Sequence, residues 1–122
     1  MTLKELYANI GADYDQALRV LRIDKLLTKH IRRFPKNDAV GNLITCRDTM
    51  DAVELFESAH AVKGLCAILG LTEMSEKASI IADEFRTGND RSMSDEEVKA
   101  LIDEIEALYQ KTSLGIMDYI NS

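Results

Sequence analysis

Residues 51–70, DAVELFESAHAVKGLCAILG, have the pattern of one long amphipathic helix. Asp51 and Glu54 form a D-x-x-E start signal, and Gly70 marks the end of the pattern. Apolar residues recur every three or four positions, which is typical of one buried stripe. They are Ala52, Leu55, Phe56, Ala59, Val62, Cys66 and Leu69. We therefore expect a central helix around which the rest of the chain packs.

Four segments before residue 51 also carry helix signals. The first two begin with capping side chains, and the third begins near Asp24 and ends at Pro35, the only proline. The fourth is a short helix with Asp38 as its N-cap. The cap pairs of the first two segments are Thr2 with Glu5 and Asp13 with Gln16.

Two further helices are predicted after residue 70. The first has Thr72 as its N-cap, an apolar stripe at helical spacing, and Gly88-Asn89 as its end. The second begins with a capping box of Ser94 and Glu97 and continues to Ile120. Short connections between long amphipathic helices favour antiparallel neighbours. We expect an all-α fold, an up-and-down antiparallel four-helix bundle with short N-terminal lid helices, as one domain over residues 1–122.

The composition limits the class of protein. With 15 Lys and Arg against 21 Asp and Glu, the net charge is −6, which disfavours a nucleic-acid groove. No apolar run approaches the roughly 20 residues that span a bilayer, so we expect no membrane insertion. Cys46 and Cys66 lie outside any C-x-x-C pair and are expected to be reduced thiols in the core. We expect a cytoplasmic monomer that needs no cofactor.

One segment is basic although the chain is acidic. Between residues 19 and 36 there are seven Lys or Arg residues and one acidic residue, Asp24. Two interpretations remain open: a solvated helix face, or a docking surface for an acidic partner. Arg32 and Arg33 are the docking candidates in this segment.

His60 lies outside the buried stripe of the central helix. Its neighbours at three and four positions are Phe56, Glu57, Lys63, Gly64 and Ala67. We expect this histidine to be exposed, with the Lys63 ammonium available to stabilise a phosphoryl group on its ring. A glycine inside a helix costs about 1 kcal/mol relative to alanine, so Gly64 needs a reason. It either clears space for another protein near the imidazole or permits close helix–helix packing.

The stretch His60-Ala-Val-Lys63-Gly64-Leu-Cys-Ala-Ile-Leu69-Gly70 resembles the H-x-L-K-G-x-S-x-x-L-G signature of histidine-containing phosphotransfer (HPt) domains. The resemblance implies a helical bundle and a phosphocarrier rather than a kinase, with His60 as phosphoacceptor. It also implies that Lys63 stabilises the phosphoryl group and that Gly64 gives clearance for the partner. The partners implied are response-regulator receiver domains and hybrid sensor kinases. Phe56, Glu57 and Ala67 are candidate docking residues on the same face.

The chain departs from that signature at four positions. Val62 stands where leucine is usual, and Leu65 and Cys66 replace small or hydroxyl residues. Met50 lies in a turn where glycine is common. Val62 and Cys66 are on the buried stripe, so they affect packing rather than chemistry. Leu65 lies near the edge of the His60 face and could alter the choice of partner.

Three other interpretations deserve comparison. Glu57 and His60 form an E-x-x-H motif of the kind that binds iron in helical bundles, but a second such motif is missing. His30 is followed by Arg33 and Phe34, so a bulky ring stands where a phosphoacceptor needs clearance. The third interpretation is a non-catalytic helical adaptor that binds a receiver or regulator without phosphotransfer.

Overall fold

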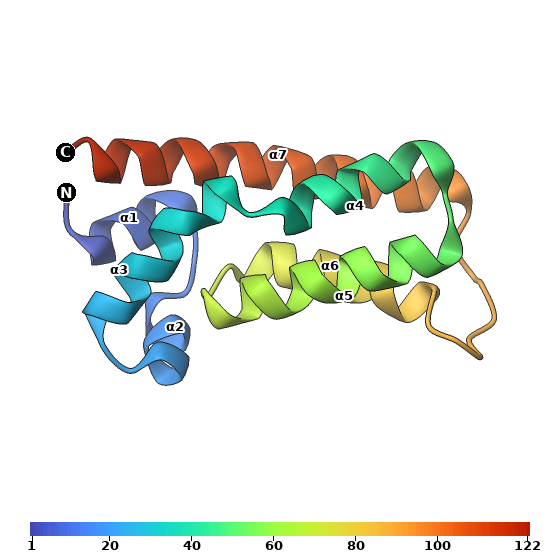
Figure 1. Ribbon diagram of the computed structural model, residues 1–122, viewed down its shortest axis with the longest axis horizontal. Coiled ribbons are helices and arrows are strands. Elements are labelled where there is room, and N and C mark those ends of the chain that lie inside the picture. Colours follow the sequence, from blue (N-terminus) through green and yellow to red (C-terminus); the bar gives the residue numbers. More distant parts are fainter.

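The computed structural model describes residues 1–122 and consists of seven α-helices and one 3₁₀ turn (Figure 1). The elements are α1 (Leu3–Ile10), α2 (Tyr14–Leu21), α3 (Asp24–Arg33), η1 (Phe34–Lys36), α4 (Asp38–Thr49), α5 (Ala52–Ile68), α6 (Thr72–Glu84) and α7 (Asp95–Ile120). No strand is present. The helix predicted over residues 51–70 is α5.

Helices α4 to α7 form the bundle, and successive helices run in opposite directions (Figure 1). Helix α5 packs against α4 and α6, and α7 packs against the same two helices. Helices α5 and α7 therefore lie diagonally opposite each other, with their outer faces pointing away from one another. This arrangement confirms the predicted up-and-down antiparallel bundle.

The core joins the bundle to the N-terminal helices. Twenty-six buried apolar residues form one cluster that includes members of α1, α2 and α3. The predicted stripe of α5 contributes Leu55, Ala59, Val62, Cys66 and Leu69, each no more than 1% exposed. Ala52 was predicted to belong to this stripe but is exposed, because it is the first residue of the helix and lies beyond the end of the core.

The short helices α1 to α3 cover one end of the bundle, where the two chain termini also lie (Figure 1). The Tyr7 hydroxyl donates a hydrogen bond to the Leu69 carbonyl at 2.6 Å, and the Asp13 amide donates to the Gly70 carbonyl at 2.8 Å. Gly70 has a φ of +70°, and a Cβ there would collide with the Asp13 carbonyl. The predicted lid is thus attached to the C-terminal end of α5.

Most helix starts agree with the sequence patterns. Thr2 with Glu5 and Ser94 with Glu97 form capping boxes, and Asp13 and Asp51 cap α2 and α5. Met50, in the turn before Asp51, ends α4 in the left-handed conformation with a φ of 51°. This backbone conformation explains why a glycine is favoured at that position.

Three predicted boundaries were wrong. Asn37, not Asp38, is the N-cap of α4, because the Asn37 side-chain oxygen accepts from the Ala39 amide at 2.8 Å. Thr72 is the first residue of α6 rather than its cap, and its hydroxyl donates to the Gly70 carbonyl instead. Helix α6 ends at Glu84, four residues before Gly88. Helix α4, predicted to be short, has 12 residues.

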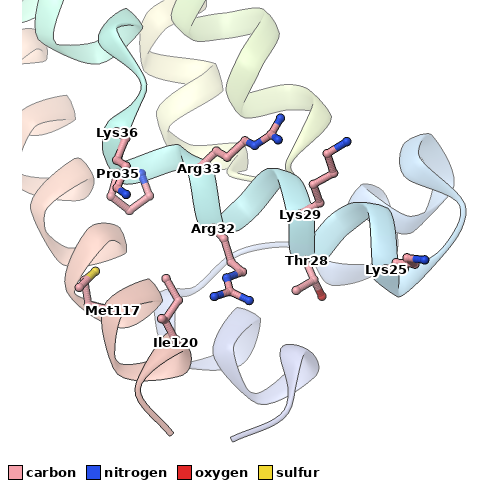
Figure 2. A pocket seen from close by; sticks show the side chains of 9 residues that line it. All are labelled: Lys25, Thr28, Lys29, Arg32, Arg33, Pro35, Lys36, Met117 and Ile120. Carbon is pink, nitrogen blue, oxygen red and sulfur yellow. The ribbon is translucent and has the colours of Figure 1, made fainter.

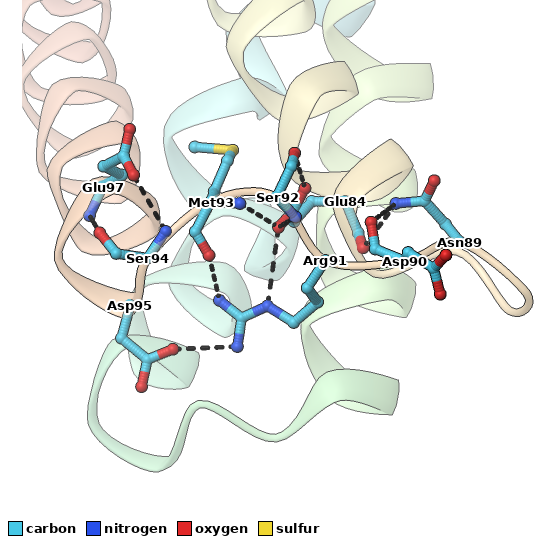
Figure 3. A network of polar contacts seen from close by, with 9 residues as sticks. All are labelled: Glu84, Asn89, Asp90, Arg91, Ser92, Met93, Ser94, Asp95 and Glu97. Atoms are coloured by element: carbon cyan, nitrogen blue, oxygen red, sulfur yellow. Dashed lines mark hydrogen bonds and ion pairs between the residues drawn. The ribbon is translucent and has the colours of Figure 1, made fainter.

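Glu84 explains why α6 ends early (Figure 3). Its buried carboxylate accepts hydrogen bonds from the Ser92 amide at 2.9 Å and the Met93 amide at 2.7 Å. The Asn89 side chain donates to the Glu84 carbonyl, and Arg91 reaches Asp95 at the start of α7. The Glu84 carboxylate is therefore the main anchor of the connection between α6 and α7, and Asn89 adds a hydrogen bond to the end of the helix.

Candidate functional site

His60 lies in the middle of α5 and is exposed. The helix begins at Asp51, whose side chain accepts from the Glu54 amide at 3.0 Å. Residues 59 and 62 beside His60 are completely buried, so the register of the helix directs residue 60 away from the core. The exposure predicted for His60 is confirmed.

A continuous exposed surface surrounds this imidazole, which we call the His60 face. It consists of Val53, Glu57, His60, Ala61, Gly64, Ala67 and Ile68. Val53 is 65% exposed and Ile68 is 44% exposed, which is unusual for large apolar side chains on the central helix. Neither residue was predicted from the sequence. Both nevertheless have helical spacing from His60, since Val53 lies seven positions before it and Ile68 eight positions after it.

Phe56 stacks on the imidazole of His60. The two ring centroids are 5.7 Å apart and the ring planes differ by 14°. Just after the end of α6, the Arg86 guanidinium carbon lies 5.8 Å from the centroid of the Phe56 ring. Phe56 was predicted from the sequence but Arg86 was not, because Arg86 lies in the segment after α6 and has no local signal.

Lys63 is half-buried on the side of α5 that faces α6. Its backbone carbonyl accepts a hydrogen bond from the Ser75 hydroxyl at 3.1 Å. A hydrogen bond from Arg86, with a smaller contribution from the Lys63 ammonium, holds the pKa of Asp83 below its ordinary value. Lys63 and Arg86 therefore place two positive charges along the α6 side of the His60 face, with Asp83 between them.

Gly64 lies one turn beyond His60 and is open to solvent. A Cβ built there would meet no atom within 4 Å beyond its own helix surroundings. Gly115 in α7 is a contrasting case, because a Cβ there would collide with Ile10 of α1. Close helix packing therefore accounts for Gly115 and not for Gly64.

Three depressions border the His60 face. One of about 500 Å³ lies near Phe56, Glu57 and Arg86, and one of about 300 Å³ lies near Lys63 and Ala67. The third, of about 430 Å³, joins Leu65 and Ile68 to residues of α2 and α3. The structure thus gathers Phe56, Glu57, Lys63, Gly64 and Ala67 around His60.

The two arginines proposed for docking do not lie together. Arg33 lines the depression that includes Leu65 and Ile68, and it also lines a groove between α3 and α7. Arg32 lines only that groove. Figure 2 shows Arg32 extending toward Ile120 while Arg33 leaves α3 in another direction.

The chain was compared with protein families, curated proteins and solved structures. The family model described as Hpt domain matches residues 8–111. The chain belongs to the Hpt domain family. No curated protein and no solved structure matches it. The family match confirms the resemblance to Hpt domains and supports a phosphotransfer role in two-component signalling, in which Hpt domains are phosphocarriers that interact with receiver domains and kinases.

Other potentially reactive groups of this Hpt domain are placed differently from His60. Cys46 and Cys66 are free and buried, as predicted, and burial raises the pKa of Cys66 to about 12. His30 is exposed on α3 and lines the depression with Leu65. No three His, Cys, Asp or Glu side chains are grouped as metal ligands, and none of the helices has the length and hydropathy needed to cross a membrane.

Proposed function

We propose that His60 accepts a phosphoryl group from the aspartyl phosphate of a receiver domain and passes it to the aspartate of another receiver. The observation that carries this proposal is the exposed imidazole in the middle of a rigid helix, with open space one turn away at Gly64. The receiver's acidic pocket must approach the ring closely, and Gly64 removes the side chain that would stand nearest on the following turn.

The phosphoryl transfer requires little of this chain beyond holding an accessible imidazole toward the receiver. A ring nitrogen of His60 attacks phosphorus, the bond from phosphorus to the aspartate oxygen breaks, and the carboxylate leaves. Transfer to the second receiver reverses these steps with a new carboxylate as nucleophile. Such reactions depend mainly on positioning and electrostatic stabilisation. The receiver's acidic pocket and its Mg²⁺ provide most of the stabilisation.

Lys63 and Phe56 prepare the ring for this reaction. The Lys63 ammonium, one turn from His60, stabilises the added negative charge of the phosphoryl group. Phe56, stacked on the imidazole, limits the orientations of the ring. The half-burial of Lys63 restricts its freedom, which favours a fixed charge near the ring.

The His60 face supplies the docking surface for the receiver. Val53 and Ile68 give exposed apolar area at its two ends, and Glu57 and Ala67 lie between them beside His60. Arg33 extends this surface across the depression near Leu65 and adds a positive charge for an acidic partner.

A transfer assay tests the assignment. A receiver domain is phosphorylated with a labelled small phosphodonor in the presence of Mg²⁺ and mixed with the protein. Label should move to the protein as an acid-labile, alkali-stable phosphoryl group, and His60→Gln should abolish this transfer. His30→Gln is the matched control, because it removes the only other histidine and should transfer like the wild type.

Two results would contradict the proposal. One is label that persists in His60→Gln, and the other is loss of label in His30→Gln alone. Receiver binding without any transfer would favour the adaptor, the alternative that the sequence left open. Circular dichroism of both variants should match the wild type, since both histidines are exposed.

A further inference from the structure

A groove lies between α3 and the C-terminal end of α7 (Figure 2). It has a volume of about 630 Å³. Five cationic side chains line it: Lys25, Lys29, Arg32, Arg33 and Lys36. Met117 and Ile120 of α7 provide its apolar part, and Met117 is 46% exposed.

These five cations have no partner within the molecule. None of them makes a side-chain hydrogen bond or an ion pair, whereas Arg47, Lys77, Arg86 and Arg91 all pair with carboxylates elsewhere. Lys25 and Lys29 are four residues apart on α3, as are Lys29 and Arg33. Each such like-charge pair destabilises a helix by roughly 0.2–0.5 kcal/mol. The helix dipole favours Arg32 and Arg33 in the last turn of α3, but it does not account for Lys25 and Lys29, so helix stability explains only part of the basic cluster.

The spacing of the charges indicates the shape of a ligand. Lys25 and Lys36 are eleven positions apart along α3 and η1, which corresponds to roughly 16 Å at the rise of an α-helix. A single phosphate cannot reach cations spread over this length. An extended peptide of about five residues spans it, and its side chains can bring carboxylates to several of the cations.

The shape and surroundings of the groove argue against two other anionic partners. Nucleic acid would extend past the groove onto a chain whose net charge is −6. A membrane surface would call for apolar side chains that project, but Met117 and Ile120 line a hollow with cations around it. A concave basic surface with an apolar part fits a protein segment best.

We propose that this groove binds an acidic segment of a partner protein, which places carboxylates on the α3 cations and an apolar side chain against Met117 and Ile120. The groove shares Arg33 with the depression that borders the His60 face, whereas its other four cations and its two α7 side chains do not line that depression. The acidic segment therefore binds mainly through residues that the receiver surface does not use. The inference goes beyond phosphotransfer and does not depend on it.

A peptide titration tests the groove directly. The probe is a short fluorescein-labelled peptide of alternating glutamate and leucine, and the control probe has glutamine in place of glutamate. The acidic peptide should bind the full chain, with NMR shifts confined to α3, η1 and the last turns of α7, and binding should weaken as salt is added. The double variant Arg32→Glu with Lys36→Glu should lower the affinity at least tenfold.

The matched control is Lys99→Glu with Lys111→Glu, which changes the net charge equally on α7 outside the groove. It should bind the peptide within about threefold of the wild type, since neither residue lines the groove. Equal losses in both variants, or equal binding of the glutamine peptide, would overturn the proposal. So would inorganic phosphate, duplex DNA or phosphatidylserine vesicles that bind this groove more tightly than the acidic peptide.

Discussion

The aromatic ring of Phe56 lies nearly parallel to the imidazole of His60, with centroids 5.7 Å apart and planes 14° apart. The two residues are one helical turn apart on α5, so the stack needs no other element to form. Phe56 is half-buried, and it therefore holds a fixed surface against an imidazole that is otherwise exposed. We propose from this relationship that Phe56 is a positioning residue for His60.

Replacing Phe56 tests that role. Phe56→Leu removes the flat surface, and if the stack contributes about 0.5–1.5 kcal/mol, transfer to His60 should slow by roughly twofold to tenfold. Phe56→Tyr keeps the ring and should retain the wild-type rate. The measurement is the single-turnover rate from a saturating phosphorylated receiver, together with the NMR line shape of the His60 ring. A slower rate in both variants with an unchanged ring signal would show a role in docking instead.

Gly64 and Gly115 allow one substitution to be compared at two helix positions. Gly64→Ala adds a methyl group in open space and should raise the free energy of unfolding by about 0.5–1 kcal/mol. Gly115→Ala places the same methyl group against Ile10 and should lower it by about 1–3 kcal/mol. Urea denaturation measures the free energy of unfolding of both variants. Destabilisation by Gly64→Ala would mean that a packing role at Gly64 had been missed.

A longer side chain at Gly64 should act on the partner rather than on the fold. Gly64→Gln projects toward the surface that the receiver must approach, so transfer should slow by about tenfold or more, equivalent to roughly 1.4 kcal/mol. Its unfolding free energy should stay at or above that of the wild type. Ala61→Gln adds the same side chain at another exposed position of the His60 face, and it should slow transfer less than Gly64→Gln. Equal slowing in both variants would indicate that the face is sensitive to any added bulk.

The sequence was sufficient for the helices and for the centre of the site, since both depend on local patterns. Spacing along one helix places Phe56, Glu57, Lys63, Gly64 and Ala67 around His60, and the structure has them there. Arg86 could not be predicted, because its position beside Phe56 depends on how α6 packs on α5.

The errors at helix ends have a different physical origin. Asp38 and Thr72 are residue types that commonly cap helices, but Asn37 accepts the capping bond from the Ala39 amide, and the Thr72 hydroxyl donates to the Gly70 carbonyl instead. The end of α6 depends on Glu84 binding the backbone of residues 92 and 93, which is a contact between different segments. The sequence could not reveal this contact, because a glutamate at residue 84 is equally compatible with an exposed position on the helix.

Arg32 and Arg33 should differ in their effect on receiver binding. Arg33 lines the depression next to Leu65 and Ile68, so Arg33→Glu should weaken binding of a receiver by about threefold to tenfold at low salt. The difference from the wild type should shrink as salt screens the charge. Arg32→Glu changes the net charge equally but lies only in the α3–α7 groove, and it should have a smaller effect. Fluorescence anisotropy at two salt concentrations measures both variants, and equal effects would remove Arg33 from the docking surface.

Glu84 should make the stability of the fold depend on pH in the acid range. Hydrogen bonds from the Met93 backbone, and then from Ser92, hold the pKa of Glu84 below its ordinary value. Its carboxylate therefore stabilises the fold above the unfolded-chain value of about 4.3, and this stabilisation is lost as pH falls through the lower folded-state pKa. Glu84→Gln should be less stable than the wild type at pH 7, and the difference should narrow in acid.

Urea unfolding midpoints measured from neutral to acid pH would test whether the stability difference between the wild type and Glu84→Gln narrows in acid. Glu76→Gln, an exposed residue of α6 without an ion pair, is the control for loss of one negative charge and should follow the wild-type curve. Because the Glu84 carboxylate binds the backbone of Ser92 and Met93, amide exchange at these two residues should also quicken as the pH effect sets in, after correction for intrinsic rates. A Glu84→Gln variant with the same acid dependence as the wild type would show that another carboxylate governs it.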